Sequence, residues 1–327
     1  MSDTPKEKYL LSCDWGTSTF RLRLVQREPV SVVAEVRSDQ GAQRLAAHLP
    51  PRREARYREV LGQARRELSQ RTDITLQAVP TLISGMASAT IGWRELPYVP
   101  VPVPLAGEAL LCTEVDKDPV TVLVSGICTA TEVMRGEETE ILGLMSLSRY
   151  EARREAARLI LPGTHSKHVR VEQGSIADFV THMTGELWGL LTEQSTLSYA
   201  ATPETWRQEP ESSVQESFTQ GVRAAQEEPL TSLLFQVRAH QVLLGWEGAA
   251  NAAYLRGVLL GAELGALGRE GSANSPILLC AGPQHTAWYA KALEVLGGSR
   301  RLTVVPEATM NLAATLGHIH IARALGL

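Results

Sequence analysis

The stretch from Tyr9 to Leu24, YLLSCDWGTSTFRLRL, constrains the fold of this chain more than any other segment. An apolar run leads into Asp14, a short polar turn follows, and a segment of alternating apolar residues begins at Phe20. Alternation of this kind on both sides of a Gly/Ser/Thr-rich turn is typical of a β-hairpin. The pattern therefore predicts a strand, a tight polar turn and a second strand near the start of the chain.

The turn between these two strands has the chemistry of an anion-binding site. Gly16 has no Cβ, so its backbone can come close to a bound anion. Thr17, Ser18 and Thr19 add hydroxyl groups beside backbone N–H groups, and together these can hold phosphate oxygens. Asp14 ends the first strand, where its carboxylate can hold Mg²⁺ through water. The alternative is an ordinary β-hairpin, because Gly, Ser and Thr are common in turns.

Length and composition narrow the class of protein. A chain of 327 residues is long enough for two domains, and 44% hydrophobic with 21% charged residues is ordinary for a soluble globular protein. The net charge is −4 and Glu residues are interspersed among the Arg residues, so no nucleic-acid partner is expected. No apolar run approaches the roughly 20 residues of a membrane span, so no membrane partner is expected either.

The cysteines and the first residues indicate a cytoplasmic location. The four Cys residues form no CxxC pair, so reduced and buried thiols are expected. Residues 1–8 are polar and charged, unlike a signal peptide.

Apolar periodicity predicts further elements along the chain. Helical spacing predicts an amphipathic helix over residues 51–70 and a last helix over residues 311–325. Strands are predicted over residues 31–36, 79–83, 120–128, 159–161, 276–280 and 302–305.

Two polar segments follow predicted strands in the first half of the chain. Small residues after the 79–83 strand, followed by Trp and Tyr, suit a loop that lines a polar pocket, and the alternative is a packed Pro-rich connection. Arg135, Glu137 and Glu138 follow the 120–128 strand and precede a helix. Adjacent carboxylates beside an Arg suit a general base. The alternative is a solvated helix start, where the helix dipole favours Glu.

A second strand–turn–strand unit lies at LPGTHSKHV, with Gly163, Thr164 and Lys167 in or beside the turn. Two such hairpins in one chain are a stronger indication of phosphate binding than either alone. His165 and His168 suggest a metal pair, but no third ligand lies nearby in the sequence, so no metal is expected there. Further on, the 276–280 strand ends at a Gly turn that opens a helix, a common nucleotide-binding arrangement.

This order of two phosphate hairpins and then a strand, a Gly turn and a helix resembles the actin/hexokinase/Hsp70-like ATPase superfamily. Six longer sequence segments, given at the end of this paragraph, extend the resemblance over nearly the whole chain. They look like segments of the 2-dehydro-3-deoxygalactonokinase family. The chain departs from the family pattern at Ser166, where members can carry Cys, and at His168, where Trp is common. It also has Pro283 and His285 where a Thr/Ser-rich turn is usual. The blocks are DWGTSTFRLRL, SGMASATIGWRELPYVPVP, MRGEETEILG, LPGTHSKHV, FVTHMTGELWGLL and YLRGVLLGAEL.

The resemblance implies an α/β protein with a two-domain, actin-like ATPase fold of the ribonuclease H-like type. Each domain is expected to hold a mixed five-stranded sheet with flanking helices, and the nucleotide is expected in a cleft between the domains. The expected domains are residues 1–157 plus 311–327, and residues 158–310. ATP and Mg²⁺ are the implied cofactors. The implied reaction transfers the γ-phosphoryl group of ATP to the 6-hydroxyl of 2-dehydro-3-deoxy-D-galactonate, a step in galactonate breakdown.

The resemblance also implies roles for individual residues. Asp14 would hold Mg²⁺, and Arg135 would pair with the substrate carboxylate or the transferring phosphate. Glu137 and Glu138 lie about 100° apart on one helix, so one of them is expected to face the cleft as the base, and Glu138 is preferred. The expected phosphate-binding residues are Gly16, Thr17, Ser18, Thr19, Gly163, Thr164, Lys167 and Gly282. The expected sugar-acid pocket is lined by Ser84, Met86, Ser88, Trp93 and Tyr98.

Two other functions stay open on the sequence. One is a kinase for a different sugar acid, and the other is a non-catalytic sugar-acid sensor. Sensors of this superfamily often carry a DNA-binding helix-turn-helix, and the few residues before Tyr9 are too short for one. The presence of Asp14 and of the acidic pair also counts against a sensor. The oligomeric state is open, with a homodimer as one alternative.

Overall fold

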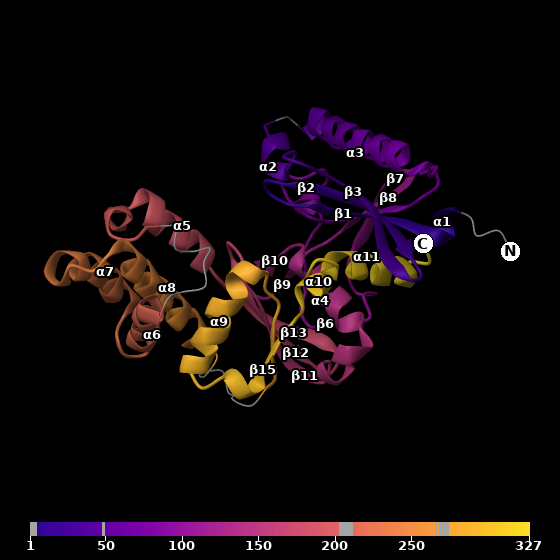
Figure 1. Ribbon diagram of the computed structural model, residues 1–327. Helices are drawn as coiled ribbons and strands as arrows, with labels where there is room; N and C mark the ends of the chain where they lie inside the picture. The colour runs from indigo at the N-terminus through magenta and orange to yellow at the C-terminus, as the bar shows by residue number, and fades with distance from the viewer. Residues whose placement is uncertain (1–4, 48–49, 203–211, 266, 268–274) are drawn as a thin grey trace. The chain divides into compact units, whose positions relative to one another are not determined.

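The computed structural model describes residues 5–47, 50–202, 212–265, 267 and 275–327 (Figure 1). It confirms the α/β class, because helices and mixed sheets share the chain. The chain divides into two compact units, which are described separately. The first unit comprises Met1–Glu155, Val171–Asp178 and Ala308–Leu327, and the second comprises Ala156–Arg170 and Phe179–Glu307.

The first unit is built on a sheet with the strand order β3-β2-β1-β4-β8-β7. The predicted hairpin is present as β1 and β2, which pair antiparallel, whereas β1 and β4 pair parallel. The expectation of five strands is wrong here, because β7 turns back onto β8 and adds a sixth strand at the edge. The strands are β1 (Tyr9–Trp15), β2 (Phe20–Arg27), β3 (Val30–Ser38), β4 (Thr81–Gly85), β7 (Cys112–Lys117) and β8 (Val120–Val124).

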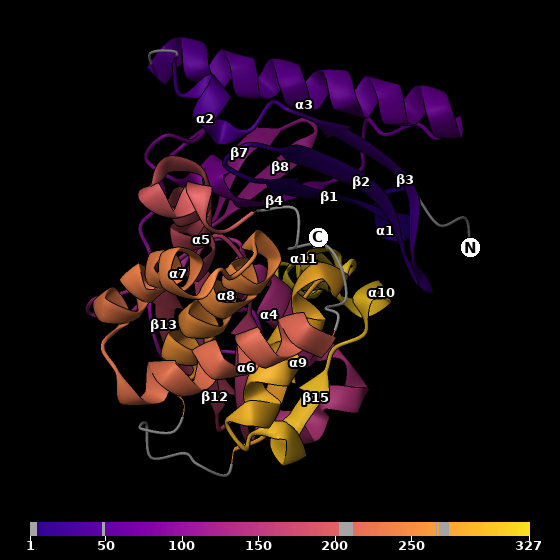
Figure 2. The same cartoon turned by 60° about the vertical axis from the view of Figure 1, so that its left-hand side comes forward.

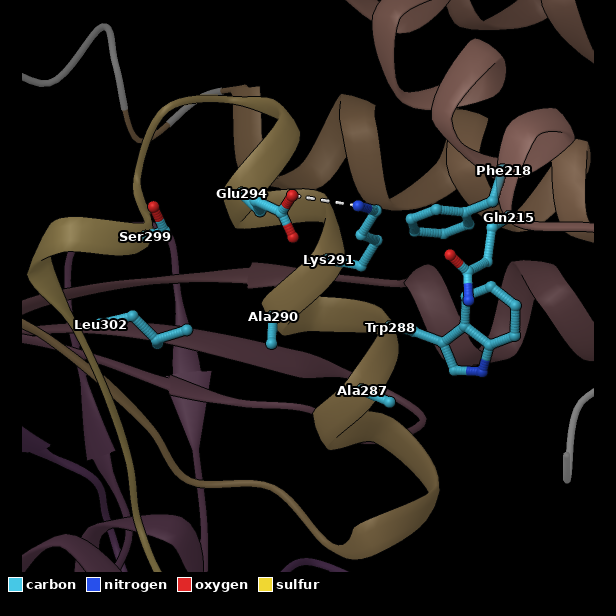
Figure 3. Close-up of a pocket in the computed structure, with 9 residues that line it drawn as sticks. All are labelled: Gln215, Phe218, Ala287, Trp288, Ala290, Lys291, Glu294, Ser299 and Leu302. Atoms are coloured by element: carbon cyan, nitrogen blue, oxygen red, sulfur yellow. Dashed lines mark hydrogen bonds and ion pairs between the residues drawn. The ribbon is translucent and has the colours of Figure 1, made fainter. Parts of the chain in front are cut away.

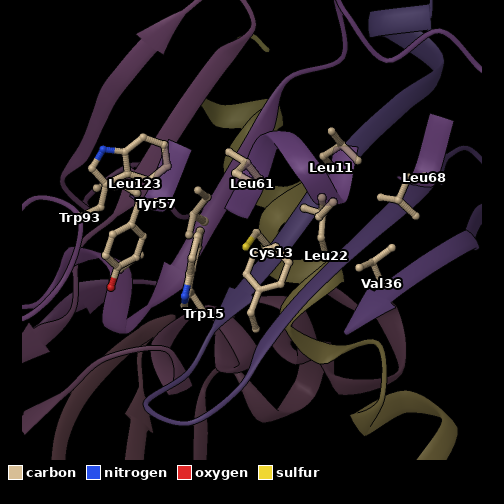
Figure 4. Close-up of a cluster of buried hydrophobic side chains, with 14 of the residues drawn as sticks. Leu11, Cys13, Trp15, Leu22, Val36, Tyr57, Leu61, Leu68, Trp93 and Leu123 are labelled. Atoms are coloured by element: carbon tan, nitrogen blue, oxygen red, sulfur yellow. The ribbon is translucent and has the colours of Figure 1, made fainter. Parts of the chain in front are cut away.

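Helices cover both faces of this sheet. The amphipathic helix predicted over residues 51–70 is α3 (Pro50–Thr72), whose Tyr57, Leu61 and Leu68 pack on Leu11 and other apolar side chains of the strands (Figures 2 and 4). The opposite face carries α11 (Ala313–Ala324), which is the predicted last helix, and α4 (Glu137–Ser146) packs on α11. Shorter helices of this unit are α1 (Pro5–Lys8) and α2 (Ala42–Leu45), and α10 (Glu307–Met310) leads back into it.

A buried polar contact holds α11 on the sheet. Ser12 Oγ on β1 and His318 Nδ1 on α11 are hydrogen-bonded at 2.8 Å, and both side chains are buried. Burial lowers the pKa of His318 to about 3, so the imidazole is neutral at physiological pH. The C-terminal segment is therefore fixed to the strand that carries Asp14.

The strand predicted over residues 120–128 is two strands. The chain leaves the main sheet at Gly126, and Ile127–Cys128 (β9) pairs with β5 (Val99–Pro100) and β10 (Val133–Met134) in a separate three-stranded sheet. A Cβ at Gly126 would collide with the Met134 carbonyl and lie 2.8 Å from the Tyr98 ring. The close approach explains the break and brings Tyr98 beside the residue after β10, Arg135.

The second unit combines parallel strands with a group of helices. Strand β14 pairs parallel with β11 on one side and with β15 on the other. Buried side chains of α6, α8 and α9 form a core with β11 and β14, and α5, α7 and α8 share another. The strands are β11 (Ala156–Leu161), β12 (Ser166–Glu172), β13 (Ser175–His182), β14 (Ile277–Leu279) and β15 (Leu302–Val304). The helices are α5 (Thr184–Gln194), α6 (Ser212–Glu227), α7 (Leu230–Leu244), α8 (Gly248–Gly265) and α9 (Pro283–Val295).

The tip of the β12–β13 hairpin, Val171–Asp178, is assigned to the first unit, which the sequence did not indicate. There Ser175 and Ile176 pair with the two-residue strand β6 (Val103–Pro104). Among the described strands, β15, β14, β11, β12 and β13 are neighbours in this order, and β6 follows β13.

The thiols are unpaired as expected, but Cys112 and Cys128 are only half-buried. All four cysteines are free, and Cys13 and Cys280 are buried. Burial raises the pKa of Cys13 well above its usual value and that of Cys112 to about 11, so both stay protonated and unreactive. Among the described helices, none is long and apolar enough to cross a lipid bilayer.

Candidate active site

The turn between β1 and β2 presents its hydroxyl groups to solvent. The Gly16 N–H donates to the Thr19 carbonyl at 2.8 Å and closes the turn, while the side chains of Thr17, Ser18 and Thr19 are exposed. Backbone N–H groups at the start of α2 donate to the Gly16 and Thr17 carbonyls, both at 3.0 Å. A Cβ at Gly41 would collide with the Thr17 carbonyl, so only glycine allows α2 to come this close. The start of α2 thus supports the backbone of the turn on one side, and the hydroxyl groups of the turn are open to solvent on the other.

Asp14 lies at the end of β1, beside this turn. Its carboxylate accepts a hydrogen bond from Arg21 at 2.8 Å and keeps 38% of its side-chain surface exposed. Asp14 is opposite Arg21 in the antiparallel register and beside Ser84 in the parallel one. Arg21 was not among the site residues predicted from the sequence. Pairing the two predicted strands across the turn nevertheless places Arg21 opposite Asp14. The half-exposed carboxylate is available to a ligand from the solvent side.

Two glycines bring the start of α4 to the end of β1. A Cβ at Gly85 would lie 2.7 Å from the Trp15 carbonyl, and one at Gly136 would lie 3.5 Å from Gly85 Cα. Both have positive φ, 88° and 113°, a region that side-chain-bearing residues rarely adopt. The ends of β1 and β4 and the start of α4 therefore meet, and the predicted carboxylates of the first unit are gathered in one place.

The structure separates the two glutamates of the acidic pair. Glu138 has no exposed surface, and its carboxylate accepts hydrogen bonds from the Gly136 N–H at 2.6 Å and from the Thr139 hydroxyl at 3.0 Å. Burial, and then the charge of Glu137, raise the pKa of Glu138 to about 8. Glu137 is half-buried and accepts a 3.2 Å hydrogen bond from the Arg135 N–H. Of the pair, Glu137 is the one with surface to offer a substrate.

Glu140 belongs to the same group of carboxylates and was not singled out in the sequence. It follows Glu137 by three residues, a spacing that places both on one side of the helix. Burial raises the pKa of Glu140 to about 8, with the charge of Asp14 as the next cause. This effect shows that Glu140 and Asp14 are close enough to interact. A protonated Glu140 at neutral pH limits the negative charge of the group.

The donor set of this region fits Mg²⁺ held mainly through water. In the described part of the chain, no group of three or more His, Cys, Asp or Glu side chains is arranged to bind a metal directly. Mg²⁺ usually keeps several waters and is bound through one or two carboxylates plus substrate phosphates. The half-exposed Asp14 carboxylate beside a turn of hydroxyl groups matches that requirement.

The Arg135 side chain binds the loop that follows β4. Its guanidinium donates to Ser88 Oγ at 2.6 Å and to the Leu96 carbonyl at 3.0 Å. The same group lies 4.2 Å from the centre of the Tyr98 ring, within cation–π range. Ser88 Oγ in turn donates to the Val124 carbonyl at 2.6 Å. The structure thus brings Arg135, Ser88 and Tyr98 together, with Arg135 holding the loop in place.

The other residues expected in the sugar-acid pocket differ in exposure. Ser84 is buried on β4, and Met86 is half-buried. Trp93 is buried in the hydrophobic core, where it stacks on Tyr57 with ring centres 5.8 Å apart and meets Trp15 edge-on (Figure 4). The Trp93 side chain therefore stabilises the loop from its core side.

In the second unit, the turn between β11 and β12 lies on the start of α5. The Glu186 N–H donates to the Thr164 carbonyl at 3.0 Å, and His165 Nε2 is 2.5 Å from the Glu186 carboxylate. Thr164 is exposed and Gly163 is half-buried. The turn is open to solvent, as a phosphate-binding turn requires.

Lys167 and Gly282 complete the set of residues predicted to bind phosphate. Lys167 lies on β12 and is buried, so its ammonium group is not freely exposed. Gly282 is the residue before α9, and a Cβ there would meet no atom within 4 Å. The backbone at the start of this helix is open to a ligand.

A buried carboxylate on α8 connects several segments around the second hairpin. Glu263 accepts hydrogen bonds from Ser166 Oγ at 2.7 Å, His168 Nε2 at 2.8 Å and the Tyr289 hydroxyl at 3.0 Å. Thr184 also hydrogen-bonds to it. Burial alone would raise the pKa of Glu263, but these hydrogen bonds and the charge of His168 lower it, so the carboxylate is ionised. No local sequence pattern indicates this network, because its members come from four elements.

A buried Arg lies near the start of α9. The Arg256 guanidinium is 4.1 Å from the ring centre of Trp288 and 5.2 Å from that of Trp188. Burial lowers its pKa to about 8. The charge of Arg256 in turn contributes, after burial, to a lowered pKa of His285 in the first turn of α9.

A cavity of about 660 Å³ lies along α9 in the second unit, lined by Phe218 and Trp288 on one side and Ser299 and Leu302 on the other (Figure 3). Lys291, the one cation among its described lining residues, forms a 3.0 Å ion pair with Glu294. The walls are mostly apolar, so the cavity does not match a phosphate group.

The first unit therefore combines a turn of exposed hydroxyls, a carboxylate at the strand end and a helix start with further carboxylates. These are the parts that phosphoryl transfer needs, because that reaction depends on positioning and on neutralising charge. This combination defines a candidate site for phosphoryl transfer to a small molecule, the reaction class of small-molecule kinases.

Comparison with known proteins identifies the family. A model of the 2-keto-3-deoxy-galactonokinase family matches residues 14–315. A Rhizobium meliloti (strain 1021) protein named for 2-dehydro-3-deoxygalactonokinase activity is 34% identical over 311 residues, 92% of this chain and 94% of that protein. The 2-dehydro-3-deoxygalactonokinase of Escherichia coli (strain K12) is 29% identical over 292 residues, 88% of this chain and 90% of that protein.

A solved structure from Sinorhizobium meliloti, whose description names the same activity, superposes with a TM-score of 0.79. It shares 31% identity, and the match covers 97% of this chain and 99% of that one. This chain belongs to the 2-keto-3-deoxy-galactonokinase family, which confirms the resemblance that the sequence blocks carry.

Proposed function

We propose that this protein transfers the γ-phosphoryl group of ATP to the 6-hydroxyl of 2-dehydro-3-deoxy-D-galactonate, a step in galactonate breakdown. The observation that supports this most strongly is the family match over residues 14–315. That range begins at Asp14 and includes the turn of the first hairpin, the whole second hairpin and the start of α4. The substrate comes from the names of the relatives, and the reaction type is supported by the groups gathered in the first unit.

The residues of the first hairpin bind the phosphates in this proposal. Thr17, Ser18 and Thr19 donate hydroxyl hydrogen bonds, and the backbone of Gly16 allows close approach. Asp14 would hold Mg²⁺ through water, and the bound ion would supply positive charge beside the phosphate oxygens. Arg21 orients the Asp14 carboxylate through its 2.8 Å hydrogen bond and limits its rotation.

Glu137 is the better candidate for the general base, in place of the preferred Glu138. A base must come within about 2.6–3.2 Å of the proton it removes. Glu138 has no exposed surface and its carboxylate is already hydrogen-bonded, so it would need a rearrangement of α4 to reach a substrate. Glu137 is half-buried and close to the loop that Arg135 holds. In this proposal Glu138 fixes the helix start.

Arg135 is a positioning residue in this scheme. Its guanidinium makes two hydrogen bonds and a cation–π contact inside the first unit. It therefore keeps the segment from Ser84 to Tyr98 in the shape that receives the sugar acid. Met86 and Tyr98, both half-buried, are the residues of this segment with surface to offer the substrate.

The second unit contributes to nucleotide binding in the same proposal. Thr164 and Gly163 offer an exposed turn, and Gly282 offers an open backbone at the start of α9. Lys167 is buried, so it acts by fixing β12 or reaches phosphate only after a local movement. Glu263 sets the position of β12 through Ser166 and His168.

A coupled assay of ADP release over a panel of 2-keto-3-deoxy sugar acids tests the proposal. The panel includes both C4 epimers and acids that lack the 6-hydroxyl, and phosphorus NMR locates the new phosphate. We expect turnover with 2-dehydro-3-deoxy-D-galactonate and none with the acid that lacks the 6-hydroxyl. A higher kcat/KM for another acid would change the assigned substrate and leave the assignment as a kinase unchanged. Binding of sugar acid with no ADP release from any acid would favour a sensor.

A further inference from the structure

The first unit contains a cavity of about 400 Å³ beside α3, which we call the α3 cavity. One wall is the side of α3 between Arg58 and Ser69, and the other is formed by residues 75–77 and by Asp116 and Pro119 near the turn between β7 and β8. Small-molecule sites have volumes of about 300–1,000 Å³, so the α3 cavity is large enough for a small ligand.

Arg65 is a buried cation in the wall of this cavity. It is 9% exposed, and its guanidinium donates to Thr81 Oγ1 and to the Leu76 carbonyl, both at 2.5 Å, and to the Val79 carbonyl at 3.2 Å. Burial lowers the pKa of Arg65 to about 10, so the group is still charged at neutral pH. In the described part of the chain, no carboxylate pairs with Arg65. Buried charges are normally paired, so the group missing here is an anion.

The other charged groups of the α3 cavity leave it positive. Asp116 is the one acid among the described lining residues, and its carboxylate already accepts from Arg58 Nε at 3.0 and 3.3 Å. Arg66 is exposed, and within the described residues its side chain makes no hydrogen bond or ion pair. Arg65 and Arg66 are therefore two cations that line one cavity without an acidic partner.

The uncharged walls restrict the rest of the ligand. Most of the cavity wall is apolar, with Leu61, Leu76 and Pro119 among the lining residues. A hydroxyl-rich sugar acid would leave several hydroxyl groups without partners there. A carboxylate accepts two parallel hydrogen bonds from a guanidinium, and an apolar body gains free energy by leaving water. The chemistry of the cavity therefore favours an acid with a compact apolar body.

Gly62 keeps the α3 cavity open. It lies inside α3, where glycine weakens a helix relative to residues with a side chain. A Cβ at Gly62 would lie 3.5 Å from Arg66 Nη1, an ordinary contact with the end of a flexible side chain. The packing of the fold thus gives no steric reason for glycine at this position. Because Gly62 lines the cavity, a longer side chain there would occupy the space of a ligand.

We propose that the α3 cavity binds a small carboxylic acid with an apolar body, such as an aromatic or a branched short-chain acid. The carboxylate lies against Arg65 and Arg66 and supplies the missing negative charge. The apolar body lies against Leu61 and Leu76.

This site is separate from the candidate active site. Arg65 donates to Thr81, the first residue of β4, whereas Asp14 is beside Ser84, near the end of the same strand. Three residues of extended strand separate the two positions by about 10 Å. The proposal is therefore independent of the reaction assigned above, and a failed binding experiment leaves that assignment unchanged.

Isothermal titration calorimetry of the full chain tests the proposal with four probes. Benzoate and 3-methylbutanoate carry a carboxylate on an apolar body, gluconate carries it on a hydroxylated chain, and inorganic phosphate has no body. We expect benzoate and 3-methylbutanoate to bind at least tenfold more tightly than gluconate and phosphate. Absence of binding by both apolar acids overturns the proposal, as does phosphate or gluconate binding as tightly as benzoate.

Substitutions on α3 locate the site. Gly62→Leu should abolish benzoate binding and at the same time raise the melting temperature, because leucine favours a helix more than glycine does. Arg66→Gln should raise the dissociation constant of benzoate about tenfold, since one charged donor is lost. Arg52→Gln is the matched control, because Arg52 is an exposed arginine of α3 outside the cavity.

The variants are compared at equal fold and activity. Circular dichroism and kcat without added acid should equal those of the wild type in Gly62→Leu, Arg66→Gln and Arg52→Gln. Benzoate should raise the melting temperature of the wild type and leave that of Gly62→Leu unchanged, because only a ligand bound to the folded chain stabilises it. Wild-type benzoate affinity in Gly62→Leu overturns the proposal, and so does an equal loss of affinity in Arg52→Gln and Arg66→Gln.

Discussion

Replacing Glu138 by Gln should remove a dependence of stability on pH. The folded chain holds this carboxyl at a pKa of about 8, against 4.5 when unperturbed, first because of burial and then because of the charge of Glu137. Below pH 4.5 the carboxyl is protonated in both the folded and the unfolded chain, so it gives the free energy of unfolding no dependence on pH. Between 4.5 and 8 the unfolded chain loses the proton while the folded chain keeps it, so the free energy of unfolding falls as pH rises.

The size of the effect follows from this window. One proton held only by the folded state changes the free energy of unfolding by about 1.4 kcal/mol per pH unit. Over the window from 4.5 to about 8 the loss is on the order of 5 kcal/mol, complete once the pH exceeds the folded pKa. Gln has no proton to lose, so its free energy of unfolding does not fall in this range. The Glu138→Gln variant should therefore become more stable than the wild type by an amount that grows with pH. Its side chain keeps the size of Glu and an oxygen to accept the Gly136 N–H.

Urea unfolding of wild type and variant at intervals from about pH 5 to about pH 9 gives the comparison directly. The difference between the two free energies should rise with pH and level off near pH 8. Glu140→Gln is a matched comparison, because the pKa of Glu140 is also raised to about 8, by burial and by the charge of Asp14. Parallel curves for wild type and Glu138→Gln would refute the reasoning, since they would mean that Glu138 titrates alike in both states.

Three further substitutions test the site. Asp14→Asn should lower kcat by about 10²–10³-fold with an unchanged circular dichroism spectrum, since one well-placed charge is lost, and a variant that keeps a tenth of wild-type turnover contradicts the metal role. Glu137→Gln should slow single-turnover phosphoryl transfer by about 10²–10⁴-fold at unchanged nucleotide affinity, whereas Glu138→Gln should keep most of the wild-type rate. A larger rate loss in Glu138→Gln than in Glu137→Gln would return the role of general base to Glu138. Glu263→Gln should cost about 3–5 kcal/mol of stability and raise KM for ATP more than it lowers kcat, and an unchanged KM would argue against positioning through β12.

The elements that carry the site were predictable because their signals are local. The alternation around Gly16 and the hydroxyl residues of the turn indicate a hairpin regardless of what packs on it. The position of Arg21 opposite Asp14 also follows from pairing the strands across that turn. The same holds for α3, whose apolar spacing is that of a helix lying on a sheet.

The exposure of individual side chains was not predictable, because it depends on packing between distant segments. The 100° between Glu137 and Glu138 shows that they face different ways, but the packing of α4 on α11 and on the strand ends decides which one is buried. Trp93 follows a polar loop in sequence and yet fills the core beside Tyr57, which belongs to α3. The break in the predicted 120–128 strand depends on the approach of Met134 to Gly126.

The Glu263 network makes a prediction about the departure at position 168. His168 donates to a buried carboxylate, so His168→Trp removes one donor from Glu263 and adds volume in a packed interior. A hydrogen bond to a charged group contributes about 1.5–3 kcal/mol and overpacking costs about 1–3 kcal/mol, so stability should fall although Trp is common in the family. The double variant His168→Trp/Glu263→Gln should lose less stability than the sum of the two single losses, because a neutral amide needs the missing donor less. Thermal unfolding of the two single variants and the double variant measures this coupling. Additive losses would mean that His168 and Glu263 stabilise β12 independently, despite their 2.8 Å contact.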